Sequence, residues 1–261
     1  MTIRFADGAG YEPYMGTWSR LVGDTFLDWL APAPGLRWLD VGCGNGAFTE
    51  MIVDRTAPAA VDGVDPAEGQ LAFARTRPAA RLARFHQGDA MSLPFPDAAF
   101  DAAVMPLVIF FVPDPAVGVA EMARVVRPGG VVAAYGWDMP GGGFPYQSLQ
   151  DEMRALGVPV SQPPSRDASR LDVMQSLWTG ADLRDVETRA ITVTRTYETF
   201  DDYWTIILRG PSVAPKLAGM PPDELAFLKA RMRARLSSDA EGRITCKARA
   251  NAVKGCVKRP Y

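Results

Sequence analysis

The residues best suited to chemistry form a glycine-rich segment with a carboxylate beside it. Residues 39–46 read LDVGCGNG, so that Gly42, Gly44 and Gly46 alternate with other residues. Glycine at such positions lets the backbone turn sharply and approach a ligand closely. This spacing differs from the GxGxxG pattern of dinucleotide-binding folds. Asp40 places a carboxylate just before the turn, which favours a ligand with an ammonium group over one with a pyrophosphate.

Two more carboxylates follow later apolar runs. Asp65, next to Pro66, lies 65 − 44 = 21 residues beyond Gly44. An acid about 20 residues after a glycine loop can accept hydrogen bonds from two ribose hydroxyls. Asp89 is placed to accept a hydrogen bond from the amine of an adenine, with Ala90 packing on the ring. Two alternatives stay open: Asp65 also suits a turn or helix cap, and Asp89 also suits an ordinary surface loop.

The elements that must position these residues alternate between short apolar runs and helical patterns. Strands are predicted at 37–41, 60–65, 84–87, 100–105 and 131–135. Helical spacing is clearest from Val119 to Val126, and Arg127-Pro128-Gly129-Gly130 is expected to stop that helix. This alternation predicts a parallel sheet with helices on both faces. Ligands in such sheets bind at the carboxyl ends of the strands.

The pattern changes after Trp137. The expected elements are loops at 139–144 and 159–164, a sixth strand at 186–193, helices at 200–208 and 225–236, and a last strand within 244–257. The insertion of about 40 residues before the last strand exceeds ordinary loop lengths. An insertion of that size predicts a lid over a site. The predicted fold class is therefore α/β: a Rossmann-like sandwich with a mostly parallel seven-stranded sheet, an N-terminal capping segment and a helical insertion near the C-terminus.

Taken as an ordered set, the motifs resemble the class I S-adenosylmethionine-dependent methyltransferases, and specifically the branch of ubiquinone/menaquinone-type C-methyltransferases. The resemblance rests on segments 39–46, 63–66, 88–95, 100–101 and 125–130, and it covers residues 11 to 138. It implies a single methyltransferase domain over 1–261. Its parts are an N-terminal cap at 1–30, a cofactor-binding core at 31–138 and substrate-side elements with a helical lid at 139–261.

The resemblance also implies S-adenosyl-L-methionine as the cofactor and assigns its contacts. Gly42 and Gly44 would lie against the methionine part, and Met105 would face the methyl-donor side. In the N-terminal stretch, the guanidinium of Arg20 would match the cofactor carboxylate, and Tyr11 would close the pocket. An aromatic N-terminal helix that only packs on the core is the alternative. The candidate cofactor-binding residues are Tyr11, Arg20, Asp40, Gly42, Cys43, Gly44, Asp65, Pro66, Asp89, Ala90 and Met105.

No catalytic residue is assigned. Methyl transfer from a sulfonium depends on positioning and desolvation, and it needs a base only if the acceptor must lose a proton. The single histidine, His86, lies within a predicted strand and is expected to be a core or edge residue. Asp138, Tyr135, Tyr14 and Tyr203 are candidate bases, and nothing in the sequence singles one out.

The acceptor is expected to be a small molecule, aromatic or quinol-like, and its identity stays open. Trp137, Trp178, Tyr203 and Trp204 could line an apolar acceptor pocket. For Tyr203 and Trp204, whose spacing is helical, packing in the core is the favoured interpretation.

Composition limits the other possibilities. The 261 residues are 48% hydrophobic with a net charge of −2, which shows no bias toward nucleic acid or membrane. No run has signal-peptide or membrane-span character. Three cysteines without a CxxC pair suggest neither disulfides nor a metal site. We expect a reduced, cytoplasmic protein, and the oligomeric state is undetermined.

A basic C-terminal segment keeps two alternatives open. From Lys229 to the end, ten basic residues face two acidic ones, which gives 10 − 2 = +8. An RNA or protein methyltransferase could use this charge, but no RNA-binding motif accompanies it, so a nucleic-acid partner is not expected. A non-catalytic module that binds S-adenosylmethionine is the other alternative. The glycine spacing and Asp40 disfavour a dehydrogenase.

Overall fold

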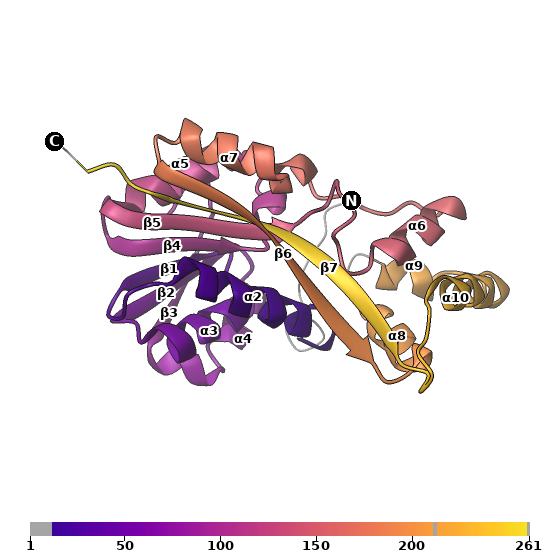
Figure 1. Ribbon diagram of the computed structural model, residues 1–261. Helices are drawn as coiled ribbons and strands as arrows, with labels where there is room; N and C mark the ends of the chain where they lie inside the picture. The colour runs from indigo at the N-terminus through magenta and orange to yellow at the C-terminus, as the bar shows by residue number, and fades with distance from the viewer. Residues whose placement is uncertain (1–11, 211–212, 260–261) are drawn as a thin grey trace.

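Figure 1 shows the computed structural model, which describes residues 12–210 and 213–259. Its strands form one seven-stranded sheet with the order β3-β2-β1-β4-β5-β7-β6. They are β1 (Arg37–Val41), β2 (Ala60–Asp65), β3 (Ala83–Gln87), β4 (Phe100–Pro106), β5 (Val126–Trp137), β6 (Arg184–Tyr197) and β7 (Ile244–Cys256). Strands β1 to β5 pair in parallel, and β7 runs antiparallel to both β5 and β6. The predicted mostly parallel, seven-stranded α/β fold is confirmed.

Helices cover both faces of this sheet. They are α2 (Thr17–Leu30), α3 (Ala47–Thr56), α4 (Glu68–Ala74), α5 (Pro115–Val125), α6 (Gln147–Ala155), α7 (Leu171–Gly180), α8 (Phe200–Ile207), α9 (Ala214–Ala218) and α10 (Pro222–Arg235). Helices α2 and α3 lie on one side of the sheet and α5 and α7 on the other (Figure 1). Shorter turns are η1 (Glu12–Gly16), η2 (Pro78–Arg81), η3 (Ile109–Phe111) and η4 (Arg166–Ser169). No described helix has both the length and the apolar character that a membrane crossing requires.

The central strands form because their residues are apolar on both faces. Leu39 of β1, Val104 of β4 and Ala133 of β5 are all fully buried. Parallel strands covered by helices on both sides read as continuous apolar runs for this reason. The helix after β4 begins with a cap, since the Asp114 carboxylate accepts hydrogen bonds from the N–H groups of Ala116 at 3.1 Å and Val117 at 3.3 Å.

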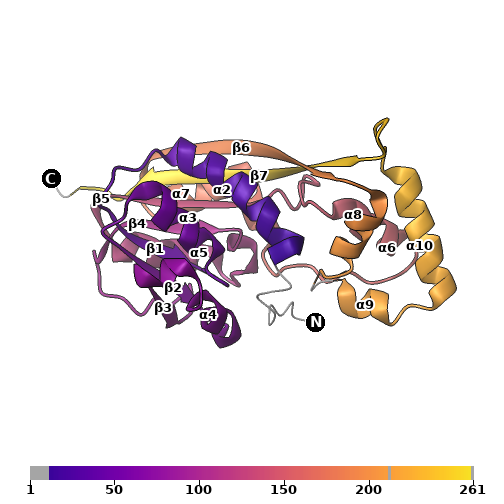
Figure 2. The same cartoon turned by 90° about the horizontal axis from the view of Figure 1, so that it is seen from below.

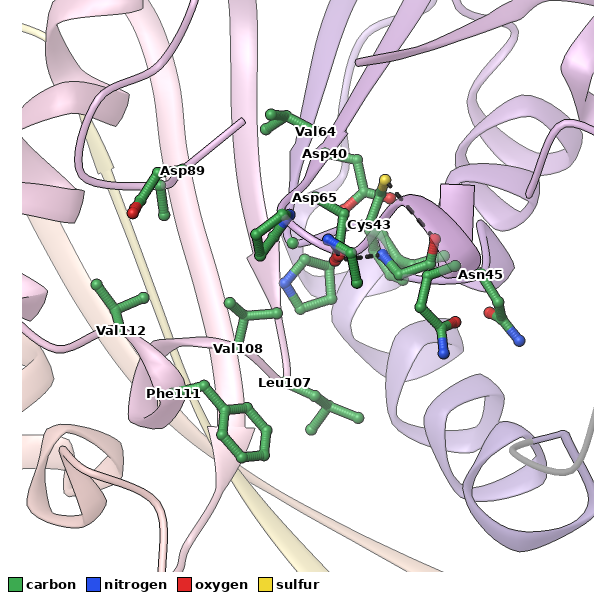
Figure 3. A pocket seen from close by; sticks show the side chains of 18 of the residues that line it. Asp40, Cys43, Asn45, Val64, Asp65, Asp89, Leu107, Val108, Phe111 and Val112 are labelled. Carbon is green, nitrogen blue, oxygen red and sulfur yellow. Dashed lines mark hydrogen bonds between the residues drawn. The ribbon is translucent and has the colours of Figure 1, made fainter. Parts of the chain in front are cut away.

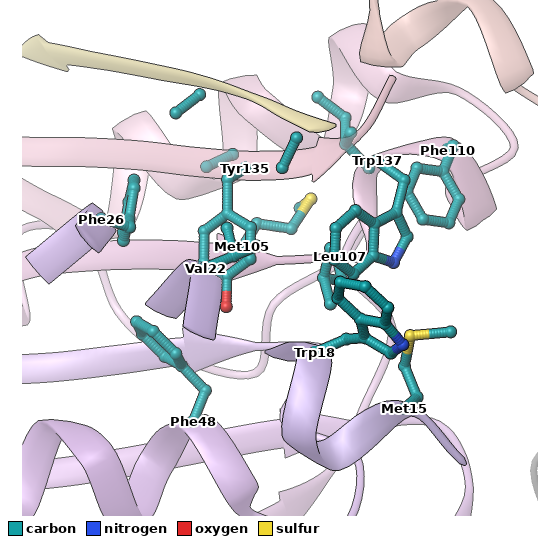
Figure 4. Packing of buried hydrophobic residues seen from close by; sticks show 14 of the residues in the cluster. Met15, Trp18, Val22, Phe26, Phe48, Met105, Leu107, Phe110, Tyr135 and Trp137 are labelled. Carbon is teal, nitrogen blue, oxygen red and sulfur yellow. The ribbon is translucent and has the colours of Figure 1, made fainter. Parts of the chain in front are cut away.

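The described part of the N-terminal segment is an aromatic helix that packs on the sheet, which is the alternative considered for this stretch. Trp18, Val22 and Phe26 on α2 are fully buried; Val22 and Phe26 lie beside Tyr135 of β5, and Trp18 lies near Leu107 and Trp137 (Figure 4). The rings of Phe26 and Tyr135 lie 4.8 Å apart between centroids. The hydroxyl of Tyr146 accepts a hydrogen bond from Trp18 Nε1 at 3.2 Å and donates one to the Tyr14 carbonyl at 2.5 Å. The start of the described chain is therefore held to the loop before α6.

Residues 127–130, which were expected only to stop a helix, also form the start of strand β5. Helix α5 ends at Val125, and β5 begins at Val126 rather than at Val131. The pairing of β4 with β5 shifts register between Phe100 and Ala102, which absorbs the proline and glycines. Gly129 N–H donates to the Val257 carbonyl at 2.8 Å. Pairing with the far end of the chain therefore makes this segment extended.

Strands β6 and β7 form a ribbon that runs past the rest of the sheet. Strand β6 has 14 residues, more than the predicted 186–193. The pairing of β5 with β7 ends at Trp137 and Ala250, whereas β6 and β7 stay paired out to Tyr197 and Ile244. The end of this ribbon carries α8, α9 and α10, which lie together with α6 away from β1–β3 (Figure 2). We call α6, α8, α9 and α10 the distal helices.

Candidate functional site

A cavity of about 950 Å³ lies at the carboxyl ends of β1 to β4 (Figure 3). Its position is the one expected for a ligand in a parallel sheet, and its volume suits a small molecule. The residues that line it are Ser19, Asp40, Gly42, Cys43, Gly44, Asn45, Ala47, Phe48, Val64, Asp65, Pro66, Ala67, Gly69, Gln70, Gly88, Asp89, Ala90, Pro106, Leu107, Val108, Phe111, Val112, Pro113, Tyr135, Gln162, Pro163 and Pro164.

The glycine-rich segment forms a tight turn whose backbone faces this cavity. The N–H groups of Gly42 and Cys43 both donate to the Val64 carbonyl, at 2.7 and 3.1 Å. Gly42 has a φ of +73°, and a Cβ there would lie 2.5 Å from a methyl carbon of Val108. Gly44 has a φ of +52°, and a Cβ there would meet nothing closer than the Gln70 Oε1 atom at 4.0 Å. The turn thus requires glycine at both positions and leaves open space beside Gly44.

Asp65 joins this turn to the end of β2. One carboxylate oxygen accepts a hydrogen bond from Gly44 N–H at 3.0 Å and the other accepts from Ala67 N–H at 2.8 Å. Burial raises the pKa of Asp65 above its ordinary value, although these two hydrogen bonds oppose the shift. A carboxylate offers about four lone-pair positions. Asp65 therefore combines both interpretations of its sequence position: it caps the following turn, and it keeps acceptor capacity at the cavity.

Asp40 carries an unpartnered buried oxygen. Its side chain is fully buried, and its Oδ2 atom accepts a hydrogen bond from Thr49 Oγ1 at 2.6 Å. Its Oδ1 atom is buried without a hydrogen-bond partner among the described residues. Burial, and to a smaller extent the charge of Asp65, raises the pKa of Asp40 to about 7 against the Thr49 hydrogen bond. Buried polar atoms are normally satisfied, so this atom indicates a donor or cation supplied by a ligand.

Asp89 and Ala90 line the cavity from the loop after β3. The Asp89 carboxylate accepts a hydrogen bond from Met91 N–H at 2.8 Å, and its carbonyl accepts one from Ser92 N–H at 3.1 Å. These bonds fix the turn that presents Ala90. Eight predicted residues thus meet in one cavity: Asp40, Gly42, Cys43, Gly44, Asp65, Pro66, Asp89 and Ala90.

Three other predicted residues are not brought to this cavity. Met105 is 1% exposed and lies near Gly118 of α5, because strand side chains alternate between faces and the next residue, Pro106, is the one that reaches the cavity. Arg20 is exposed on α2, and its neighbour Ser19 lines the cavity instead. Tyr11 lies outside the described residues.

Among the candidate bases, only Tyr135 lines the cavity. His86 Nε2 lies 2.7 Å from an oxygen of Asp62, away from the lining. Asp138 forms an ion pair with Arg249. Burial raises the pKa of Tyr203 far above its ordinary value, so this phenol does not ionise near neutral pH.

The four aromatic residues considered for an acceptor pocket are core residues. Trp137, Trp178, Tyr203 and Trp204 are each at most 5% exposed, and none lines the cavity. Trp178 Nε1 donates a hydrogen bond to the Val132 carbonyl at 2.8 Å, which fastens α7 to the sheet.

The predicted lid also lies elsewhere. No described residue between β6 and β7 lines the cavity, because the long ribbon carries those helices beyond it. Part of the lining instead comes from the segment after β4, with Leu107, Val108, Phe111 and Val112 (Figure 3), and another part from Gln162, Pro163 and Pro164. The rule that ligands bind after strand ends pointed to the first segment, whereas nothing local in the sequence indicated the second.

Sequence comparison finds similarity to known methyltransferases over part of the chain. Residues 39–134 match the family model described as a methyltransferase domain. The chain is 33% identical over 163 residues to a demethylmenaquinone methyltransferase of Renibacterium salmoninarum, covering 61% of this chain and 65% of that protein. It is 38% identical over 128 residues to a malonyl-[acyl-carrier protein] O-methyltransferase of Serratia marcescens, covering 49% of each. The chain thus spans about half of the length of this second relative.

Solved structures share the fold. A putative methyltransferase from Bacillus halodurans superposes with a TM-score of 0.59 at 15% identity, covering 91% of this chain and 99% of that chain. A Haemonchus contortus phosphoethanolamine N-methyltransferase 2, in complex with S-adenosyl-L-methionine, gives a TM-score of 0.60 at 18% identity, covering 96% of this chain and 56% of that chain. At such identities the likeness concerns the fold alone.

Proposed function

We propose that this chain, whose residues 39–134 match a methyltransferase domain, is a class I S-adenosylmethionine-dependent methyltransferase that transfers a methyl group from that cofactor to a small-molecule acceptor. The observation that carries the proposal is the buried, unpartnered Asp40 oxygen beside the open turn at Gly44. The cofactor has an ammonium group on its methionine part, which is the partner that such a carboxylate needs.

The cavity residues suit the rest of the cofactor. Gly42 and Gly44 would lie against the methionine part, since both line the cavity and the space beside Gly44 is open. Asp65 would accept hydrogen bonds from the ribose hydroxyls with its remaining lone pairs. Asp89 and Ala90 would hold the adenine. When bound, the cofactor supplies a methyl group that a sulfonium has already activated for displacement.

The chain contributes binding, orientation and exclusion of water. Holding a methyl group and an acceptor atom in line converts an encounter between two molecules into a step within one complex. Among the candidate bases, Tyr135 alone lines the cavity, and it packs between Phe26 and Phe48 with ring centroids 4.8 and 5.7 Å away. We therefore assign the acceleration to positioning rather than to proton transfer by a side chain.

The acceptor is proposed to be aromatic or quinol-like. The names of two relatives support a quinone precursor as the acceptor. One relative is a demethylmenaquinone methyltransferase, and another is a 2-methyl-6-phytyl-1,4-hydroquinone methyltransferase of rice. The apolar residues Leu107, Val108, Phe111 and Val112, which line the cavity, agree with such an acceptor.

An RNA or protein acceptor is the less favoured alternative, because the chain's own acids compensate most of the basic C-terminal segment. Lys229 and Arg233 pair with Asp201, at 2.7 and 3.2 Å. Arg231 and Arg235 pair with Glu152, at 2.5 and 2.9 Å. Further ion pairs within the described residues join Arg243 to Asp239, Arg249 to Asp138 and Lys254 to Glu187.

The thiols of the three cysteines are free, which supports a reducing, cytoplasmic location.

Calorimetric titration tests the cofactor. S-adenosylmethionine and S-adenosylhomocysteine should bind in the micromolar range, NADH should not bind, and Asp65→Ala should abolish binding. Asp28→Ala, whose side chain is 69% exposed, is the matched control and should bind normally. Failure of both ligands with folded protein would refute the proposal.

Incubation with a panel of phenols, quinols and amines then tests turnover. Formation of S-adenosylhomocysteine with any of them separates an enzyme from a module that only binds the cofactor.

A further inference from the structure

The start of helix α2 is not held by a local cap. The helix follows η1, a single turn of π-helix over Glu12–Gly16. Its N-cap residue, Gly16, has no side chain that could accept the first N–H groups, and the first turn carries no acidic residue. Single π-helical turns occur frequently at functional sites. Because capping normally fixes a helix start, contacts from elsewhere in the fold must determine where α2 begins.

Tyr14, in the π-helical turn, makes such contacts with two parts of the chain that are distant in sequence. Its ring is buried and stacks on the ring of Tyr146, with centroids 4.4 Å apart and planes inclined by 19°. It also packs against Gly210, where a Cβ would lie 2.7 Å from the Cε2 and Cζ atoms of the Tyr14 ring. We call Tyr146 and Gly210 the Tyr14 socket.

The distal helices build this socket. Tyr146 is the N-cap residue of α6. The N–H group of Gly210 donates to the Ile207 carbonyl at the end of α8, at 3.0 Å. The Gly210 carbonyl accepts hydrogen bonds from Val213 N–H at 3.0 Å and from Ala214 N–H at 2.7 Å, where α9 begins. Since its backbone is fixed on both sides, Gly210 leaves room for the ring only because it has no side chain.

The first turn of α2 connects the socket to the cavity. Ser19 lines the cavity, and Trp18 lies near Leu107, which also lines it (Figure 4). The Tyr146 hydroxyl accepts from the Trp18 indole N–H at 3.2 Å and donates to the Tyr14 carbonyl at 2.5 Å. The position of Ser19 therefore depends on whether Tyr14 occupies its socket, although no described residue of the distal helices lines the cavity.

We propose that the distal helices set the cofactor affinity through Tyr14, which acts as a positioning residue: the ring in its socket holds α2 so that Ser19 completes the cavity. This inference rests on the proposed function. A ligand that needs Ser19 in place loses apparent affinity in proportion to the fraction of molecules whose Tyr14 has left the socket. Because such coupling is reciprocal, bound cofactor in turn stabilises the distal helices.

Two single variants empty the socket in different ways, and calorimetric titration with S-adenosylhomocysteine measures both. Gly210→Ala puts a methyl group where the ring lies, whereas Tyr14→Ala removes the ring. We expect each to weaken binding by about tenfold, since fewer molecules hold Ser19 in place. Gly219→Ala, in the same part of the chain, is the control. Its Cβ would come no closer than 3.6 Å to the Pro215 carbonyl oxygen, so it should bind normally.

The double variant Tyr14→Ala/Gly210→Ala separates this coupling from general destabilisation. Without the ring, the added methyl group has nothing to displace, so the double variant should bind like Tyr14→Ala. Independent damage at two sites would instead add up to a loss of about a hundredfold, and that result would overturn the inference. The double variant also relieves the clash, so the comparison with Tyr14→Ala stands even if Gly210→Ala does not fold.

Hydrogen exchange measures the reciprocal effect at a distance from the cavity. Saturating S-adenosylhomocysteine should slow amide exchange in α8 of the unaltered chain, and it should not do so in Tyr14→Ala. Unchanged affinity in Tyr14→Ala, or exchange in α8 that does not respond to the ligand in the unaltered chain, would overturn the inference alone. An unaltered chain that did not bind S-adenosylhomocysteine at all would contradict the proposed function.

Discussion

The Nε atom of Arg77 donates a hydrogen bond to the Asn45 carbonyl at 2.7 Å, inside the glycine-rich turn. The same guanidinium pairs with Glu50 of α3 at 2.9 Å, and the Arg77 side chain is only 12% exposed. Arg77 therefore ties together the turn and the helix that follows it, from a segment outside the motif. Charge-assisted hydrogen bonds of this kind are stronger than neutral ones.

Arg77→Ala is expected to weaken S-adenosylmethionine binding by roughly tenfold to a hundredfold, which corresponds to the loss of a charged hydrogen bond. Arg77→Lys should restore part of the affinity, because an ammonium can reach one of the two partners. Titration calorimetry measures both, and the turnover number with saturating cofactor should change less than the affinity.

Arg75→Ala is the matched control for Arg77. Arg75 is 44% exposed and pairs with Glu68 at 2.5 Å, on the same stretch of chain. The Arg75→Ala variant should bind the cofactor normally. If both variants lost affinity equally, general destabilisation of this region would explain the effect.

The affinity for S-adenosylmethionine is expected to rise as pH increases from about 6 to about 8. The raised pKa of Asp40, about 7, means that its carboxyl is largely protonated at pH 6 and ionised at pH 8. The ionised form is the one that attracts an ammonium. Asp40→Asn should bind more weakly and show a flat profile over this range. A wild-type affinity profile as flat as that of the variant would contradict the assignment of Asp40 to the cofactor's ammonium group.

The same carboxyl predicts the pH dependence of stability. The unfolded chain releases this proton near pH 4, whereas the folded chain keeps it up to about pH 7. The stability linked to this proton is complete below about pH 4 and declines as pH rises to about 7. In urea unfolding, Asp40→Asn should therefore lose less stability than the unaltered chain between pH 5 and pH 8.

Gly42→Ala should abolish cofactor binding and destabilise the fold. Its cost has two parts, because φ is +73° and the new Cβ would lie 2.5 Å from Val108. Gly35→Ala isolates the first part, since Gly35 has a φ of +77° and nothing within 4 Å of its Cβ position. We expect about 1 kcal/mol for Gly35→Ala and clearly more for Gly42→Ala in urea unfolding. Similar costs would show that Val108 moves aside freely.

Tyr146→Phe is expected to lower the free energy of unfolding by about 1 to 3 kcal/mol. The substitution removes the hydroxyl that accepts from the Trp18 indole N–H and donates to the Tyr14 carbonyl, while it keeps the ring that stacks on Tyr14 at 4.4 Å. Urea unfolding checks this value. A change below about 0.5 kcal/mol would indicate that the hydrogen bonds of this junction are replaced by water.

The parts of the site that follow from the sequence are those whose geometry is local. Asp40 and the glycines that follow it lie within one turn, so their arrangement depends on only a few neighbouring residues. Asp65 ends β2 and Asp89 follows the end of the adjacent parallel strand β3, so the topology brings them to the same edge of the sheet. These positions could be predicted because neither depends on the direction of one side chain.

The structure differs from the prediction at side chains whose direction depends on their exact position along a helix or strand. Neighbouring residues in a helix point about 100° apart, so residue type alone favoured Arg20 where packing selects Ser19. The same holds for Met105 and Pro106, which face opposite sides of a strand. The lid was misplaced because the extra length of β6 is set by its pairing with β7, which no local pattern encodes.

The β6–β7 ribbon also has a consequence for how this molecule can diversify. Tyr197 and Ile244 are partners in the ladder, so the 243 − 198 + 1 = 46 residues between them leave and rejoin the sheet at the same rung. Topologically this stretch is only an enlarged hairpin turn. Its described residues contribute no side chain to the cavity. A different helical module in this place would therefore leave both the described cavity lining and the threading of all seven strands intact, provided that it also covers α6 and Tyr14.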